Sequence, residues 1–323
     1  MSFIRLLDRD IDPNELGFTY SHEHIVCSPP HWVDRNENDL LLDDPEKSGK
    51  DVELFKSLGG KTIVDATAVD YGRTVNAVYD ISQKTGVQIV GTAGFNKGIL
   101  WDAKKPGTDE TFAQWIERSS IDELADFVIA EVEKGMNGTT LRAGQVKMGT
   151  GYNSISPLEE KTLHAVTRAQ LATGAPMHCH TEAGTMAIEQ MEMIHKDGVE
   201  LSHVSFGHMD RNPDPWMYRK LAETGAYLCF DGIGKIKYYT ESVRIGCILQ
   251  LVREGFRKQI LISGDMARKS YYASYKNGLG LGYIISKWVP RFIEEADSAG
   301  LDGQSLVDDF FINNPKNCFS FKK

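Results

Sequence analysis

The sequence predicts an α/β fold in which eight parallel strands, each followed by a helix, close into a (β/α)8 TIM barrel. Short runs rich in β-branched residues recur eight times, and a longer amphipathic segment follows each run. Such alternation is typical of βαβ units and a parallel sheet. The chain has 323 residues and contains no Pro/Ser-rich linker and no short repeat. Since barrels of this kind often reach that length as one unit, we expect a single domain over residues 1–323.

The predicted strands cover residues 18–25, 61–67, 87–94, 144–150, 175–181, 204–209, 226–233 and 260–266. The helices between them carry their own signals. In SSIDELADFVIAEVEKGMNG, Ser120 and Glu123 have capping-box spacing, and Gly135 is a suitable stop. After the fifth strand, a second apolar stripe predicts a helix with His195 in its last turn, where we expect a structural role for this histidine. An open doubly wound sheet is the alternative fold, but no GxGxxG motif follows an early strand, which weakens its dinucleotide-binding version.

Composition excludes several classes of partner. The formal net charge of −9 disfavours nucleic acid and anionic membrane surfaces. No run is long enough to span a bilayer, and the N-terminus has no signal-type apolar core. The cysteines are odd in number and widely spread, which indicates reduced thiols and a cytoplasmic location. They are Cys27, Cys179, Cys229, Cys247 and Cys318.

The segment TYSHEHIVCS places His22 and His24 two residues apart on the first predicted strand. Side chains two apart on a strand share a face, so both imidazoles would point into the barrel. The pair is then a possible metal chelate; two hydrogen-bonded histidines in a polar cleft are the alternative.

Other metal-ligand candidates follow at the ends of later strands. Active sites of such barrels lie at the C-terminal ends of the strands, and imidazoles with a carboxylate suit zinc, manganese and similar ions. Five or six ligands are too many for one tetrahedral ion that keeps a water, but they suit two ions sharing a bridge. The further candidates are Lys147, His178, His180, His208 and Asp265.

Lys147 requires a separate explanation, because a charged ammonium beside two cations in an apolar barrel would be expelled or neutralised. A neutral amine can react with carbon dioxide to give a carbamate, which carries −1 and offers two bridging oxygens. The carbamate, Asp265 and a hydroxide would then offset most of the charge of two divalent ions. A lysine that extends toward solvent at the strand end is the alternative.

The ordered segments SHEH, VKMGT, HCHTEAGT, FGHMDRN and ISGD resemble the phosphotriesterase-like branch of the amidohydrolase superfamily. The resemblance runs from Gly17 to the C-terminal NNPKNCF and covers nearly the whole chain. It implies a (β/α)8 barrel with two divalent metal ions. Zinc is the expected metal, with manganese or cobalt as alternatives, and a homodimer is the expected assembly.

The resemblance also implies a role for each ligand. His22, His24 and Asp265 would bind the buried ion, and His180 and His208 would bind the more exposed one. Carboxylated Lys147 would bridge the two ions. His178 matches no ligand of the family, so we expect it to pack beneath the site or support a ligand. His31 stays open as a first-loop candidate.

Such a centre predicts metal-assisted hydrolysis of an ester, lactone or phosphoester. A hydroxide shared by two divalent ions stays nucleophilic near neutral pH, and Asp265, the expected catalytic residue, would pass a proton to the leaving group. No serine nucleophile is needed, and GxSxG is absent.

Two cationic clusters point to the substrate. Barrels often hold phosphate at the loops after strands 7 and 8. Here those loops carry Lys235, Lys237, Arg268 and Tyr271, which we expect to bind a phosphate. The alternative is that these charges only solvate the loops. Asn96, after the third strand, replaces an aromatic residue found in lipophilic-lactone hydrolases of the family, which favours a polar substrate.

The pattern is similar to that of phospho-furanose lactonases. It predicts opening of phosphorylated five-carbon sugar lactones, of the pentono-1,4-lactone 5-phosphate type, by attack of the shared hydroxide on the ring carbonyl. Two alternatives stay open. The same metals could serve a phosphotriesterase or a neutral lactone or carboxylester hydrolase, or the barrel could be a non-catalytic binder of small anions.

Overall fold

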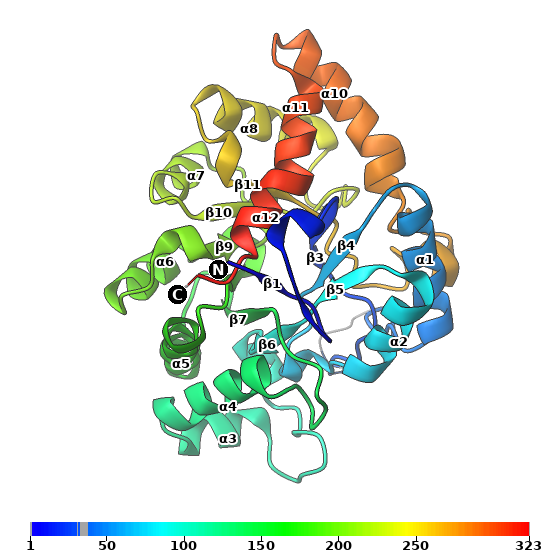
Figure 1. Cartoon of the computed structure of the whole chain (residues 1–323). Coiled ribbons are helices and arrows are strands. Elements are labelled where there is room, and N and C mark those ends of the chain that lie inside the picture. The colour runs from blue at the N-terminus through cyan, green and yellow to red at the C-terminus, as the bar shows by residue number, and fades with distance from the viewer. Residues whose placement is uncertain (1, 31, 33–37, 323) are drawn as a thin grey trace.

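The wall of the barrel is formed by parallel strands in the order of the chain (Figure 1). We describe the protein from a computed structural model, which defines residues 2–30, 32 and 38–322. The strands are β3 (Thr19–Glu23), β4 (Thr62–Asp65), β5 (Gln88–Val90), β6 (Thr92–Gly94), β7 (Gln145–Thr150), β8 (Met177–Thr181), β9 (Val204–Phe206), β10 (Tyr227–Phe230) and β11 (Ile260–Ile262). Each lies within one of the predicted ranges, and the predicted (β/α)8 fold is confirmed.

The third predicted strand is divided in two at Gly91. A Cβ atom at Gly91 would lie 2.6 Å from the end of the Leu7 side chain and 2.8 Å from the end of the Met136 side chain, so a larger residue there would require both to shift. On either side of Gly91 the strands have different partners: β5 pairs with β4, whereas β6 pairs with β7. The barrel closes where the backbone N–H of Asp265 donates to the carbonyl of His22 at 3.0 Å, which brings the end of the last strand beside the first.

Helices surround the strands on the outside (Figure 1). They are α1 (Pro45–Ser57), α2 (Val75–Thr85), α3 (Phe112–Arg118), α4 (Ile121–Glu133), α5 (Pro157–Thr173), α6 (Ala187–Lys196), α7 (Pro215–Ala222), α8 (Glu241–Arg253), α9 (Ala273–Lys276), α10 (Val289–Ser298), α11 (Gly303–Asp308) and α12 (Asn314–Cys318). The predicted capping box is present at the start of α4, where Ser120 and Glu123 each bond the backbone of the other. His195 lies exposed in the last turn of α6, as predicted.

The N-terminal end of the barrel is covered by a short hairpin that the sequence did not predict. Strands β1 (Ile4–Arg5) and β2 (Asp10–Ile11) pair antiparallel. The two chain ends meet beside it, where the N–H of Phe321 donates to the carbonyl of Phe3 at 2.8 Å (Figure 1). Ile4 packs with barrel residues Val64 and Leu261 in one apolar cluster. The functional loops therefore occupy the opposite, C-terminal end of the strands.

All five cysteines are free thiols, and four of them are buried. This agrees with the absence of a disulfide framework expected from their spacing.

Among the helices of the described residues, none combines the length and apolarity needed to cross a membrane.

Candidate metal centre

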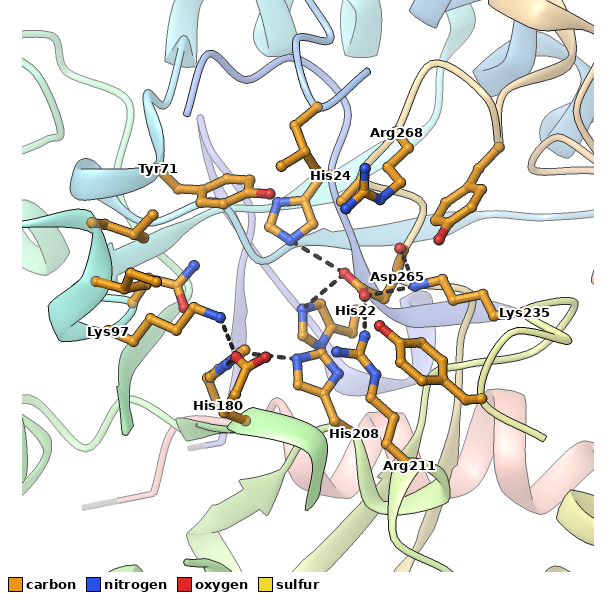
Figure 2. A pocket seen from close by; sticks show the side chains of 18 of the residues that line it. His22, His24, Tyr71, Lys97, His180, His208, Arg211, Lys235, Asp265 and Arg268 are labelled. Carbon is orange, nitrogen blue, oxygen red and sulfur yellow. Dashed lines mark hydrogen bonds and ion pairs between the residues drawn. The ribbon is translucent and has the colours of Figure 1, made fainter. Parts of the chain in front are cut away.

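A cavity of about 300 Å³ opens at the C-terminal end of the strands. Figure 2 shows its side chains converging from separate strands and loops. All six predicted metal ligands line it, namely His22, His24, Lys147, His180, His208 and Asp265. The His31 candidate lies outside the described residues.

His22, His24 and Asp265 form the first group of predicted ligands. His22 lies on β3 and His24 directly follows its last residue, Glu23; the alternation along this segment turns both imidazoles toward the cavity. Their Nε2 atoms lie 3.8 Å and 3.5 Å from Oδ1 of Asp265. One donor atom from each of the three residues lies within 4.8 Å of the other two, and all three side chains are buried. The Nε2 of His22 has no hydrogen-bond partner among the described residues, so this group fits a cation.

Glu23 turns away from these imidazoles and holds the end of the last strand in place. Its carboxylate accepts from the backbone N–H groups of Gly264 and Met266, both at 2.7 Å, and from the hydroxyl of Ser263 at 2.8 Å. These contacts fix the turn in which Asp265 adopts a left-handed conformation, with φ of 43°. The alternation of β3 thus supplies two ligands and also positions the third.

His180 and His208 form a second group of predicted ligands. Nδ1 of His180 lies 2.9 Å from Nε2 of His208. The other nitrogen of each ring contacts a carboxylate, Nε2 of His180 that of Glu182 at 2.9 Å and Nδ1 of His208 that of Asp231 at 2.7 Å. Each ring can donate its proton to the carboxylate, which leaves two nitrogen lone pairs facing each other. That arrangement requires a shared proton or a cation, so these residues also fit a metal ion.

Lys147, on β7, is 1% exposed and faces the same cavity. Its ammonium donates to the carbonyl of Ala66 at 2.8 Å. Burial lowers the pKa of Lys147 to about 8, although neighbouring carboxylates such as Asp265 oppose the shift. A larger fraction of neutral amine at pH 7 is what carbamate formation needs. The structure thus gives Lys147 surroundings that suit the predicted bridging role.

Two cations hold the remaining oxygen of Asp265. Oδ2 accepts from Lys235 Nζ at 2.6 Å and from Arg211 Nη2 at 2.5 Å. Burial alone would raise the pKa of Asp265, but Lys235 and Arg211 hold it well below the usual value. Lys235 was predicted to bind phosphate, yet its ammonium contacts Asp265. Arg211 was not predicted, although it lies in the FGHMDRN segment beside His208.

Lys237, Arg268 and Tyr271 line the cavity together, above Lys235. Arg268 lies 3.4 Å from Asp39. Among the described residues, no carboxylate lies within ion-pair distance of Lys237, which instead sits over the rings of Tyr238, at 4.8 Å, and Tyr271, at 5.5 Å. The hydroxyl of Tyr271 is buried and has no hydrogen-bond partner within the described part of the chain. Burial, followed by the charges of Arg268, Lys235 and Arg211, lowers the pKa of Lys237 to about 8.

His178 and Asn96, the two residues expected to support the site, make different contacts. Nδ1 of His178 lies 2.9 Å from the Ser205 hydroxyl, and its ring edge packs on His22 with centroids 4.6 Å apart. Asn96 lines the cavity, and its backbone N–H is held by Asp70 at 2.9 Å. The sequence analysis did not select Asp231 or Glu182, which contact ligand histidines. Glu182 directly follows the fifth predicted strand and Asp231 lies near the end of the seventh, and this position was the available signal.

The wall nearest the first and third loops is apolar. Trp32, Leu40, Ile99 and Leu100 line it, and the indole N–H of Trp32 donates to the carbonyl of Ile99 at 2.9 Å. The cavity therefore has aliphatic side chains as well as cations in its lining.

Comparisons with known proteins agree with this geometry. The chain is 60% identical to a lactonase from Listeria monocytogenes of known crystal structure, which superimposes with a TM-score of 0.97 over 99% of this chain and 100% of the other. It is 32% identical to a phospho-furanose lactonase from Mycoplasmopsis agalactiae, over 99% of this chain and 92% of the relative. The phosphotriesterase homology protein from Escherichia coli, solved with phosphate in its active site, shares 28% identity with a TM-score of 0.85, over 94% of this chain and 99% of the other.

A family model described as the phosphotriesterase family matches residues 6–319. The members of this family are hydrolases with two metal ions, and the ligand groups described above suit that chemistry. The chain therefore belongs to the phosphotriesterase family and is a hydrolytic enzyme that acts on ester bonds.

Proposed function

We propose that this enzyme is a metal-dependent lactonase that opens phosphorylated five-carbon sugar lactones, of the pentono-1,4-lactone 5-phosphate type. The observation that carries the proposal is Lys237, a cavity-facing cation with no carboxylate partner among the described residues, beside Arg268 and the unpartnered hydroxyl of Tyr271. A buried excess of positive charge next to a hydrolytic centre fits an anionic substrate. The phospho-furanose lactonases among the relatives, at 30% and 32% identity, support the same class.

In the proposed centre, His22, His24 and Asp265 would hold the inner ion, and His180 and His208 would hold the outer ion. Lys147 would bridge the two as a carbamate. Zinc suits this mixture of imidazole and carboxylate ligands, and manganese or cobalt would also be accepted. The bound ions would lower the pKa of water and polarise the acyl carbonyl of the lactone.

Asp265 is the proposed catalytic residue of the chain itself. Its Oδ1 faces His22 and His24, whereas its Oδ2 is fixed by Lys235 and Arg211. The two cations hold the carboxylate ionised and correctly oriented. In that position Asp265 accepts the proton of the attacking water and passes it to the ring oxygen, which leaves as the alcohol of the opened sugar acid.

The phosphate of the substrate is held by Lys237, Arg268 and Tyr271, and Lys235 adds its charge from beneath. Anchoring this remote group fixes the distance between the ring carbonyl and the nucleophile, which raises the rate of the chemical step. The Escherichia coli relative with phosphate in its active site supports the view that such a cavity accepts this anion.

A neutral lactone or carboxylester is a second candidate substrate. The apolar wall formed by Leu40, Ile99 and Leu100 favours it, because an aliphatic substituent could be buried there. Comparing hydrolysis of a phosphorylated lactone with hydrolysis of the same lactone without phosphate separates the two candidates. A non-catalytic anion binder is set aside because the chain belongs to a family of hydrolases. A single domain, a cytoplasmic location, a homodimer, and the absence of nucleic-acid and membrane partners stay predictions.

We expect Lys147→Met to lose metal and activity together. Methionine keeps a similar volume but cannot form a carbamate, so the ions lose their bridge. Metal analysis of purified protein should find about two ions per chain in the wild type and fewer than one in the variant. Lys56→Met, which alters an exposed lysine on α1, is the matched control. Two tightly bound ions in Lys147→Met would remove this residue from the centre.

We expect Lys237→Met to impair hydrolysis of the phosphorylated lactone selectively. A charged hydrogen bond contributes about 1.5–3 kcal/mol, so kcat/KM for this substrate should fall about 10- to 100-fold. Hydrolysis of the same lactone without phosphate should not change. Lys269→Met is the control, since Lys269 pairs with Asp43 at 2.8 Å and does not line the cavity. Equal turnover of the two lactones by the wild type would contradict the proposed phosphate site.

The phosphate site should also respond to pH. Lys237 is charged below its pKa of about 8 and neutral above it. The phosphate stays fully ionised over that range, since its second pKa is about 6. The ratio of kcat/KM for the phosphorylated and plain lactones should therefore fall as the pH rises through about 8. Ionisation of the metal centre changes kcat/KM for both lactones by the same factor, so it leaves this ratio unchanged. Lys237→Met should give a lower ratio that stays flat, and a flat wild-type ratio from pH 7 to 10 would argue against the role of Lys237.

A further inference from the structure

Asp231 contacts one predicted ligand of each metal ion. It follows β10 directly, and its side chain is fully buried. Oδ1 lies 2.7 Å from Nδ1 of His208. Oδ2 lies 2.9 Å from Nδ1 of His22 and accepts the backbone N–H of His208 at 3.0 Å. The contact to His208 is a hydrogen bond, whereas the contact to His22 is short but bent out of hydrogen-bond geometry, so that neither nitrogen of the His22 ring has a hydrogen-bond partner among the described residues.

We propose that Asp231 is a positioning residue that holds both His22 and His208 in the tautomer protonated at Nδ1, so that each ring presents the lone pair of Nε2 to its metal ion. This inference goes beyond the proposed substrate. It rests on the proposed function only because it takes His22 and His208 to be metal ligands.

The chemical reason is that an ionised carboxylate can only accept hydrogen bonds. A nitrogen lone pair at 2.7–2.9 Å from a carboxylate oxygen would be repelled, so each Nδ1 carries the proton. This holds for the bent contact to His22 as well, because the repulsion does not depend on ideal alignment. The Nε2 atoms are then left with lone pairs directed into the cavity. Nε2 of His22 has no hydrogen-bond partner among the described residues, as a metal ligand requires.

The opposite arrangement at His180 shows that the tautomers are set residue by residue. There Nε2 contacts the carboxylate of Glu182 at 2.9 Å, and Nδ1 faces the cavity. Glu182 touches a single ligand, whereas Asp231 serves ligands of both ions. Glu182 therefore provides a natural comparison for the same chemical change.

The space around Asp231 is closely fitted. A Cβ atom at Gly207 would lie 3.3 Å from Oδ2 of Asp231 and 2.9 Å from Nε2 of His178. Glycine before His208 thus allows the carboxylate to reach both imidazoles. The edge of the His178 ring also packs against His22 at a centroid distance of 4.6 Å, which restricts the His22 ring further.

An asparagine at position 231 cannot serve both rings. Its carbonyl oxygen can accept one Nδ1–H, but its amide group is a donor and requires a lone pair at the other Nδ1. That second imidazole must move its proton to Nε2 and can no longer act as a ligand in the same position. Loss of such a supporting contact typically costs 10- to 100-fold in metal affinity.

The test is nitrogen NMR of protein labelled with ¹⁵N-histidine, recorded on the metal-free protein and on the zinc-loaded protein. The signals are assigned with His22→Asn and His208→Asn. In the wild type, Nδ1 of both residues should carry a proton in both states. In Asp231→Asn, at least one of them should lose it, and chelator competition should show zinc affinity reduced 10- to 100-fold. Glu182→Gln, the same change at the neighbouring carboxylate, should leave His22 and His208 unchanged.

Two results would overturn the proposal. One is a wild-type protein in which either Nδ1 is unprotonated, and this measurement decides the question even if Asp231→Asn does not fold. The other is a folded Asp231→Asn that keeps both protons at Nδ1, whatever its zinc affinity. The metal-free spectra require no substrate, so failure of the lactonase proposal and failure of this one are distinguishable.

Discussion

The site depends on one electrostatic constraint, the burial of imidazole nitrogens that face one another in the cavity and need a shared proton or a cation. Nδ1 of His180 and Nε2 of His208 are 2.9 Å apart, and the outer nitrogen of each ring already contacts a carboxylate. Nε2 of His22 is buried without a hydrogen-bond partner among the described residues. Unpaired buried polar atoms are costly, and a cation satisfies several of them at once. The ligand end of the cavity therefore suits a bound cation.

The geometry of the barrel strands brings these buried imidazoles and Asp265 together. Alternation along β3 aims His22 and His24 inward and Glu23 outward, and Glu23 in turn fixes the turn that carries Asp265. Closure of the sheet by the N–H of Asp265 and the carbonyl of His22 brings residues 243 positions apart in the chain to one metal group. Ligands on rigid strand ends keep their spacing better than ligands on loops, which suits the proposed two-ion centre.

Much of this arrangement could be predicted from sequence. The periodicity of apolar runs located every barrel strand, and the rule that strand ends converge brought His180, His208 and Asp265 together with the first histidine pair. Contacts made across the barrel were harder to predict. The side chains of Asp231 and Arg211 contact residues that follow other strands. No local sequence pattern predicts those contacts. Lys235 was predicted to face the substrate, but the direction of a loop side chain depends on the nearest unpaired charge, which is Asp265. The β1–β2 hairpin was missed because its strands are only two residues long.

The central claim is that two ions bind where these ligands converge. The most direct measurement is anomalous X-ray scattering at the zinc edge from crystals of active, zinc-reconstituted protein. The account predicts two peaks, one among His22, His24 and Asp265 and one between His180 and His208, with density for Lys147 reaching both. Fully active crystals with no anomalous peak at these side chains would contradict it.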